Sequence, residues 1–329
     1  MPKLNKETIL RTETMLRTAM GDAIASALDD ESVVEIMVNP DGTLWLDKHG
    51  TGRIQTDVLI TPHEAERIIR LVASHIGQEA TPDAPIISAE LPGGGERFEG
   101  ILPPVTTAPS FAIRKAATKI YTLDDYVGAG IMTSEQRAVI TQAVGEKCNI
   151  LIAGGTGSGK TTLANAILHE IAKTGERVVI IEDTRELQCA TPDQIALRTR
   201  AGHVSMSDLV RSTMRLRPDR IIVGEVRGPE ALDMLKAWNT GHPGGISTIH
   251  ANSALSGLER LEQLVAERSR TSQRPLISEA IDLVIYIRGR GQAREISSIR
   301  HVHCGTTDNG QFNAPEYSYA ETFGSNLAS

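Results

Sequence analysis

Hydrophobic positions in the first third of the chain alternate between a helical and a strand period. Asn5 to Leu28 carry apolar side chains three or four positions apart, which predicts an amphipathic helix. Two short alternating runs flank Asn39 to Gly42, and such a turn sequence predicts a hairpin. Thr61 and Glu64 have the spacing of a capping box and predict the start of a second helix. These elements predict a small α+β domain over residues 1–115.

The pattern changes twice further along the chain. Core-type periodicity lapses over residues 116–130, where Gly128 and Gly130 lie, so we expect a linker there. Residues 131–302 alternate short runs that are apolar on both faces with helical patterns, which predicts an α/β domain with a largely parallel sheet covered by helices on both sides. Residues 303–329 are polar and lack a period, and we expect a loosely ordered tail.

Composition narrows the class of protein. The 329 residues include 34 Lys and Arg against 41 Asp and Glu, a net charge of −7, and only 3% are aromatic. An acidic balance with few stacking side chains argues against direct nucleic-acid binding. Three cysteines without paired spacing exclude a disulfide framework or a zinc module. Because no apolar run approaches about 18 residues and the first residues are charged, we expect a cytoplasmic protein without a membrane segment.

A glycine-rich phosphate-binding pattern lies between an apolar strand and an amphipathic helix. Its residues are Gly154, Gly155, Thr156, Gly157, Ser158, Gly159, Lys160 and Thr161, with Thr162 directly after them. Glycines let backbone N–H groups surround a phosphate, and the helix N-terminus adds a favourable dipole. Lys160 is expected to contact the β- and γ-phosphates of ATP, and the Thr161 hydroxyl to ligate Mg²⁺. The flanking strand and helix make a merely tight loop a weak alternative.

Hydrolysis of a bound nucleotide also needs a carboxylate on a neighbouring strand, to hold metal-bound water or to orient the attacking water. One predicted strand runs into Glu182 and Asp183, and another into Glu225. An acid at the carboxyl end of a parallel strand points into the crevice where ligands bind. An exposed carboxylate without a chemical role remains the alternative for either glutamate alone.

Four segments together resemble the secretion traffic ATPases, the ring ATPases of type II and type IV secretion, pilus motors and conjugation. The segments are GGTGSGKTT, IIEDTREL, RLRPDRIIVGEVRGPEA and GHPGGISTIHAN, in the order of the family's Walker A, Asp, Walker B and His boxes. The resemblance implies a RecA-like ATPase domain and a homo-oligomer in the form of a hexameric ring. Many family members carry a CxxC…CxxC module, and its absence here favours the conjugation branch.

The resemblance also implies roles for individual residues. Glu182 would activate or orient the attacking water, although the absence of the usual proline after the aspartate leaves Glu186 open as the base. Glu225 would replace the Walker B aspartate and hold Mg²⁺ through water. His250 would sense the γ-phosphate, and His242 is a second candidate for this role, although a lone histidine is often purely structural.

Arginines from the N-terminal domain are a further implication of the resemblance. Arg97 and Arg114 match family positions that reach the nucleotide, and Arg114 also ends a short apolar strand beside the predicted linker. A guanidinium there can neutralise charge that develops in phosphoryl transfer. A surface ion pair is the alternative for each. A second basic region, Arg198 to Arg217, is more simply interpreted as a solvated or subunit-facing surface.

These features predict a Mg²⁺-dependent ATPase that powers a type IV secretion or conjugative transfer machine, by domain motion within a ring. Expected partners are other copies of the chain and inner-membrane secretion proteins, at the cytoplasmic face of that membrane. One alternative is a RecA-like nucleic-acid motor, which shares the phosphate loop and the strand-end acid. Another is a scaffold that binds ATP without hydrolysing it, which the paired glutamates disfavour.

Overall fold

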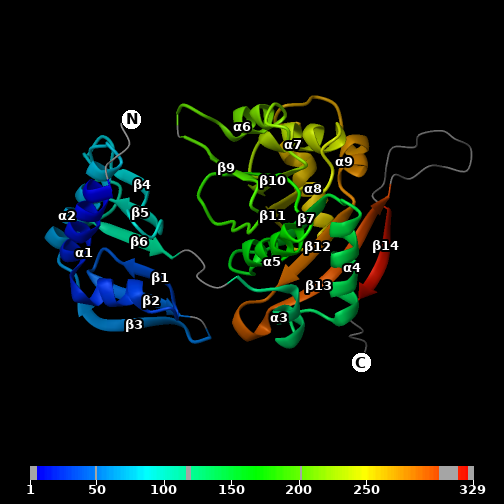
Figure 1. The fold of residues 1–329 in the computed structure, drawn as a ribbon. Coiled ribbons are helices and arrows are strands. Elements are labelled where there is room, and N and C mark those ends of the chain that lie inside the picture. Colours follow the sequence, from blue (N-terminus) through cyan, green and yellow to red (C-terminus); the bar gives the residue numbers. More distant parts are fainter. Residues whose placement is uncertain (1–5, 49, 116–119, 201, 304–317, 325–329) are drawn as a thin grey trace, which may run out of the picture. The chain divides into compact units, whose positions relative to one another are not determined.

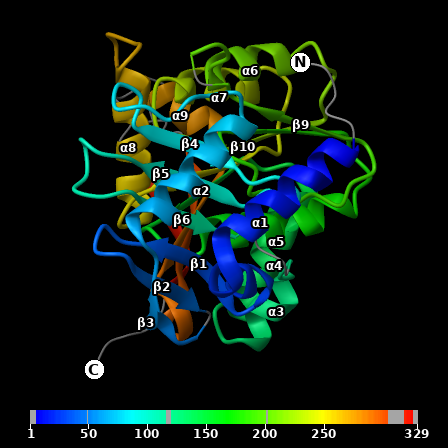
Figure 2. The same ribbon diagram turned by 90° about the vertical axis from the view of Figure 1, so that its left-hand side faces the viewer.

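The computed structural model describes residues 6–48, 50–115, 120–200, 202–303 and 318–324. The chain divides into two compact units, Met1–Thr118 and Lys119–Ser329. Each unit has its own hydrophobic core, and Figures 1 and 2 show the elements of both.

The N-terminal unit is a six-stranded antiparallel sheet with two helices. The strands stand in the order β3-β2-β1-β6-β5-β4 and the helices are α1 and α2. Their bounds are α1 Lys6–Asp29, β1 Val33–Val38, β2 Thr43–Lys48, β3 Gly52–Leu59, α2 Pro62–His75, β4 Ile86–Glu90, β5 Arg97–Ile101 and β6 Ser110–Arg114. The predicted helices and hairpin are present, and Thr61 and Glu64 form the expected capping box at α2. The α+β prediction for this part of the chain is confirmed.

The C-terminal unit is built on an eight-stranded sheet in the order β14-β13-β12-β7-β11-β10-β8-β9. The six strands from β12 to β9 run parallel, and β13 and β14 are antiparallel at one edge. The strand bounds are β7 Ile150–Gly154, β8 Val178–Glu182, β9 Gln194–Arg198, β10 Arg220–Glu225, β11 Ile246–His250, β12 Leu283–Arg288, β13 Glu295–His303 and β14 Ser318–Gly324. The largely parallel sheet predicted from the apolar runs is therefore confirmed.

Helices cover both faces of this sheet, which explains why its central strands are apolar on both sides. Leu151 of β7 belongs to the core formed with α6 to α9, and its neighbour Ile152 to the core formed with α3 to α5. The helix bounds are α3 Leu123–Gly128, α4 Ser134–Gly145, α5 Lys160–Ala172, α6 Met206–Thr213, α7 Glu230–Asn239, α8 Ala254–Ala266 and α9 Arg274–Ala280, with a 3₁₀ turn at Gly291–Ala293. Successive side chains of a strand point to opposite faces, so each face needs its own apolar set.

The structure describes elements within two segments that were expected to lack them, although residues 116–119, 304–317 and 325–329 lie outside the described residues. The expected linker, residues 116–130, contains α3, where Leu123 and Tyr126 are buried in the core of the C-terminal unit. A six-residue helix is too short to show an apolar period, which is why the sequence pattern missed it. Within the expected tail, residues 303–329, the structure describes β14, which pairs with β13.

Gly245 offers a test of how closely this unit is packed. A Cβ at Gly245 would lie 2.1 Å from the indole of Trp238, which is itself buried and donates from Nε1 to the Ile221 carbonyl at 2.9 Å. We expect Gly245→Ala to lower the free energy of unfolding by about 3 kcal/mol, because overpacking a fixed core forces side chains off their rotamers. Denaturant unfolding measures the loss. Gly128→Ala is the control, since nothing lies within 4 Å of its Cβ position, and an equal effect of both substitutions would contradict the packing argument.

Candidate functional site

The glycine-rich loop joins β7 to α5, in the order that the sequence predicts. Gly154 ends the strand and Lys160 begins the helix. Gly157 and Gly159 have φ values of 75° and 96°, a left-handed conformation that favours glycine. Ser158 is buried, and its hydroxyl donates to the Gly155 carbonyl at 2.9 Å. These contacts hold the loop in one conformation while Thr156 stays exposed to solvent.

Lys160 connects the loop to the neighbouring strands. Its ammonium is buried and donates to the Gly155 carbonyl at 3.1 Å. It also lies 3.3 Å from Nδ1 of His250, at the end of β11. On the other side of the imidazole, Nε2 lies 2.9 Å from Glu225 Oε1, and Arg227 pairs with the same carboxylate. The structure therefore brings the predicted residues Lys160, His250 and Glu225 together in one polar chain.

The contacts of His250 set its protonation state. Burial and the adjacent Lys160 ammonium lower the pKa of His250, in that order of importance, and the Glu225 carboxylate opposes them. A neutral imidazole with a proton on Nε2 fits both neighbours, because Nδ1 then accepts from Lys160 and Nε2 donates to Glu225. If the Lys160 ammonium moved to another acceptor, Nδ1 of His250 would lose this hydrogen bond.

Glu182 ends β8 as a buried carboxyl, only 5% exposed. Burial is the main cause that raises its pKa to about 7, although the N–H groups of Glu186 and Leu187 donate to Oε1 at 2.9 and 2.8 Å and oppose the shift. Within the part of the chain that the structure describes, Oε2 has no hydrogen-bond partner. A carboxyl that titrates near neutral pH with one unengaged oxygen is suited to accept a proton.

Glu186 contacts the loop directly, which Glu182 does not. Its Oε2 accepts from the Thr161 hydroxyl at 3.2 Å, and its backbone carbonyl accepts from Asn165 of α5 at 3.1 Å. Asn165 in turn accepts from the N–H of Gln188 at 2.8 Å, so α5 fixes the segment after β8. Asn165 was not expected from the sequence, because its distance from the glutamate along the chain gave no signal of this contact.

The Thr161 hydroxyl and the Glu186 carboxylate are in direct contact, and both are oxygen ligands suited to Mg²⁺. The Glu225 carboxylate ends β10 and contacts His250, and among the described residues no group of three or more acidic, His or Cys side chains is arranged to hold a metal ion by itself. Hydroxyl, carboxylate and water oxygens are the ligands that Mg²⁺ prefers, so this donor set fits the ion. Thr162, the last predicted loop residue, is partly buried in the first turn of α5.

The two candidate histidines differ in their position relative to β11. His242 lies before β11, whereas His250 ends that strand. Five strand residues span about 16 Å, so β11 separates the two histidines along the chain. Of the two, His250 has a described contact with Lys160, and a role for His242 at the phosphates stays a prediction.

Arg97 and Arg114 lie side by side in the N-terminal unit. Arg97 of β5 is the direct register partner of Arg114 of β6, and the row continues to Glu90 on β4 and Glu35 on β1. Two like charges directly opposite each other on a sheet are unfavourable by themselves. Each arginine, however, has a glutamate as its register partner on the other side, so the row is balanced in charge and the contact of both arginines with phosphate stays a prediction.

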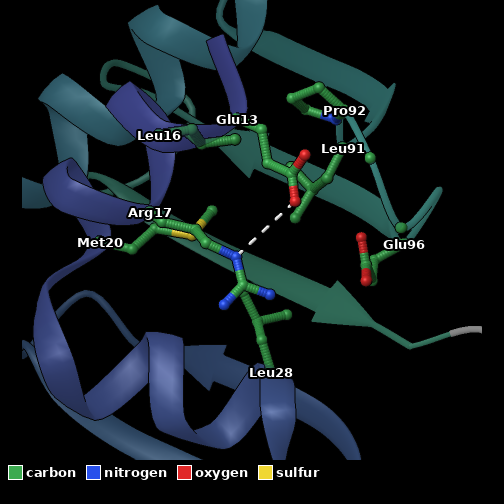
Figure 3. A pocket seen from close by; sticks show the side chains of 10 residues that line it. Glu13, Leu16, Arg17, Met20, Leu28, Leu91, Pro92 and Glu96 are labelled. Atoms are coloured by element: carbon green, nitrogen blue, oxygen red, sulfur yellow. Dashed lines mark ion pairs between the residues drawn. The ribbon is translucent and has the colours of Figure 1, made fainter. Parts of the chain in front are cut away.

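A separate pocket of the N-terminal unit does not suit a phosphate. It has a volume of about 300 Å³ and lies between α1 and the β4–β5 turn (Figure 3). Glu13 and Glu96 bring negative charge to its lining, and the one lining cation, Arg17, is bound to Asp29 at 2.8 and 3.0 Å. A polyphosphate would meet like charge there.

No helix among the described residues combines the length and the apolar composition that crossing a membrane requires.

A parallel sheet with this glycine loop, and with acids at the ends of neighbouring strands, defines a P-loop NTPase. The chain belongs to the family of type II/IV secretion system proteins, whose sequence model matches residues 47–298. The resemblance drawn from the four boxes is thereby confirmed.

Its relatives include proteins of conjugation and type IV secretion. The chain is 51% identical over 289 residues to conjugal transfer protein TrbB of Rhizobium radiobacter, covering 87% of this chain and 89% of that protein. It is 32% identical to the type IV secretion system protein VirB11 of Bartonella henselae, covering 89% and 94%. The similarity therefore extends over both units.

Solved structures show the same fold at low sequence identity. The ATPase DotB of Legionella pneumophila superimposes with a TM-score of 0.60 at 21% identity, covering 82% of this chain and 77% of that chain. The pilus retraction motor PilT with bound ADP gives a TM-score of 0.61 at 19% identity, covering 84% and 80%. Both agree with the RecA-like α/β fold that the resemblance implied.

The polar chain through His250 predicts a measurable titration. We expect Lys160→Met to raise the pKa of His250, because it removes a neighbouring positive charge that disfavours protonation. NMR titration of the His250 ring without nucleotide measures the change. Lys173→Met, at the far end of α5, is the control and should leave His250 unaltered. An unchanged His250 titration in Lys160→Met would show that the two side chains do not interact.

Proposed function

We propose that the chain hydrolyses ATP with Mg²⁺ and that the loop from Gly154 to Thr161 binds the triphosphate. The observation that carries this proposal is the convergence of Lys160, His250 and Glu225 with Thr161 and Glu186 at the carboxyl ends of adjacent strands. A cation for the phosphates, oxygens for a metal ion and an acid that titrates near pH 7 are the parts that phosphoryl transfer to water requires.

Glu182 is the proposed general base. Its Oε1 is held by two backbone N–H groups, which orients the carboxyl, and Oε2 remains available to a water molecule. Glu186 and Thr161 are the proposed Mg²⁺ side of the site, with Glu225 as a further oxygen donor. The ion, when bound, neutralises charge on the phosphates. This division of roles favours Glu182 over Glu186 as the base.

His250 is the proposed sensor of the γ-phosphate. Lys160 now contacts His250, and a triphosphate would compete for the same ammonium. A change at His250 would pass to Glu225 and to Arg227, whose backbone N–H donates to the Glu230 carboxylate, at the start of α7, at 2.7 Å. The nucleotide state would thereby reach α7 through three side chains.

The N-terminal unit is proposed to contribute Arg97 and Arg114 to the phosphates. Their adjacent positions on β5 and β6 would let both arginines contact one anionic ligand. Loss of the γ-phosphate would release this ligand and allow the two units to move about the segment that joins them. The assignment to ATP itself depends on the family resemblance.

The relatives support a role in conjugation or type IV secretion, because their names place them there. We propose that the chain forms a ring of six copies that drives pilus assembly or substrate translocation. Its proposed place is the cytoplasmic face of the inner membrane, with membrane proteins of the secretion machine as partners. We do not expect the chain to bind nucleic acid directly.

Lys160→Ala tests the nucleotide site. We expect ATP turnover to fall to background and affinity for ATP to fall about 100-fold or more, because the buried cation that faces the phosphates is removed. Phosphate release and calorimetric titration measure the two quantities, with Lys173→Ala as control. Wild-type turnover in Lys160→Ala would place the nucleotide site elsewhere.

Strong stimulation of the wild-type ATPase rate by single-stranded DNA would favour a nucleic-acid motor.

Glu182→Gln tests the proposed base. The pKa of about 7 means that kcat/KM should rise as the pH increases through 7, since only the carboxylate accepts a proton. We expect Glu182→Gln to lower kcat about 100-fold or more, to remove this rise and to retain ATP binding.

A pH series of ATPase rates measures these effects, and Glu259→Gln on the exposed face of α8 is the control. A full rate in Glu182→Gln together with a slow Glu186→Gln variant would transfer the role of base to Glu186.

A further inference from the structure

The glycine loop has a second side, opposite the strands that bear the acids. In the sheet, β11, β10 and β8 lie on one side of β7 and β12 on the other. Ile287 of β12 is the register partner of Gly154, where the loop begins. The turn that follows β12, residues 289–294, therefore lies beside the loop although it is more than 130 residues away in the chain.

Arg290 of this turn contacts the loop backbone. Its Nε donates to the Thr156 carbonyl at 3.1 Å. A Cβ at Gly157 would lie 3.3 Å from the same Nε, so the side chain runs along the loop surface. The side chain of Arg290 is exposed, and its outer nitrogens can reach a ligand that sits on the loop.

Arg294 lies against Gly159, the last glycine before the helix. A Cβ at Gly159 would be 2.9 Å from Nε and 3.0 Å from Cζ of Arg294. Nε is buried and has no hydrogen-bond partner. Among the residues that the structure describes, no acid pairs with this guanidinium. An unsatisfied buried donor is unfavourable, so the arrangement would be stabilised by an anion.

Arg288, at the end of β12 just before the turn, shows the contrast. It pairs with Glu295 across the β12–β13 ladder, and among the described residues it has no contact with the glycine loop. Of these three neighbouring arginines, the two that touch glycines of the loop lack a described carboxylate partner, and the one that does not touch the loop has one. The pattern favours a ligand over general surface charge.

We propose that Arg290 and Arg294 bind the part of the nucleotide that ATP and ADP share, at its α- and β-phosphates. This inference rests on the proposed ATPase function. The residues assigned to the bond that breaks come from β8, β10 and β11, so the terminal phosphate faces that side. The β12 side then faces the remainder of the nucleotide, and guanidinium groups bind phosphate oxygens with charge-assisted hydrogen bonds.

This role predicts a distinct kinetic effect. Contacts to the shared phosphates are present before and after hydrolysis, so they contribute to binding and not selectively to the transition state. Removing either arginine should raise KM for ATP and weaken ADP binding, while kcat at saturating ATP stays near that of the wild type. Substitution of Glu182, in contrast, lowers kcat.

The experiment compares Arg290→Ala, Arg294→Ala and Arg294→Lys with the control Arg288→Ala. Calorimetric titration with ADP and with a non-hydrolysable ATP analogue gives the affinities, and phosphate release gives KM and kcat. We expect about tenfold weaker binding of both nucleotides in each alanine variant, partial recovery in Arg294→Lys and no change in Arg288→Ala. Because Arg290 is exposed, its alanine variant should fold even if Arg294→Ala does not.

Three results would overturn the inference. Nucleotide affinities within about twofold of the wild type in both alanine variants would show that neither arginine contacts the nucleotide. Lower thermal stability with unchanged affinity would make the arginines a structural support of the loop. Weaker binding of the ATP analogue with unchanged binding of ADP would show that the arginines contact the γ-phosphate instead. Lys160→Ala separates this inference from the proposed ATPase function. If Lys160→Ala abolishes nucleotide binding while the arginine variants bind normally, only the role of the two arginines is wrong. If Lys160→Ala itself binds nucleotide normally, the proposed ATPase site is wrong.

Discussion

The buried ammonium of Lys160 is the interaction on which the arrangement of the site depends. It contacts a carbonyl of its own loop and an imidazole on another strand, so it joins β7, α5 and β11. A buried cation is costly without polar partners, and this requirement fixes both the loop and His250. The carboxylate of Glu225 then completes the chain at the next strand. One charge thereby sets the positions of three groups proposed to act on ATP.

The two-layer covering of the C-terminal sheet makes this convergence possible. Central strands that are buried on both faces can expose polar side chains only where they end, and parallel strands end at the same edge. Glu182, Glu225 and His250 occupy those ends. The same burial that forms the core also raises the pKa of Glu182, because the carboxyl lies at the boundary of the apolar interior.

Positive charge occurs in two arrangements that share a physical feature. Arg97 and Arg114 face each other across two strands, and Arg290 and Arg294 lie along one turn beside the glycine loop. In each case two arginines are neighbours in the fold, although Arg97 and Arg114 also have Glu90 and Glu35 as register partners on their other sides. The buried Nε of Arg294, which has no hydrogen-bond partner among the described residues, would be satisfied by an anion, and this supports the proposed nucleotide contact on the β12 side.

The sequence by itself determined the parallel sheet, the glycine loop and the strand-end acids, because periodicity, turn residues and capping boxes are local properties of the chain. It could not determine which side chains meet. The contact of Glu186 with Thr161, the contact of His250 with Lys160 and the approach of Arg290 to Thr156 follow from strand order. Strand order is decided by how helices and strands pack into one core, and residues distant in the chain become neighbours only then.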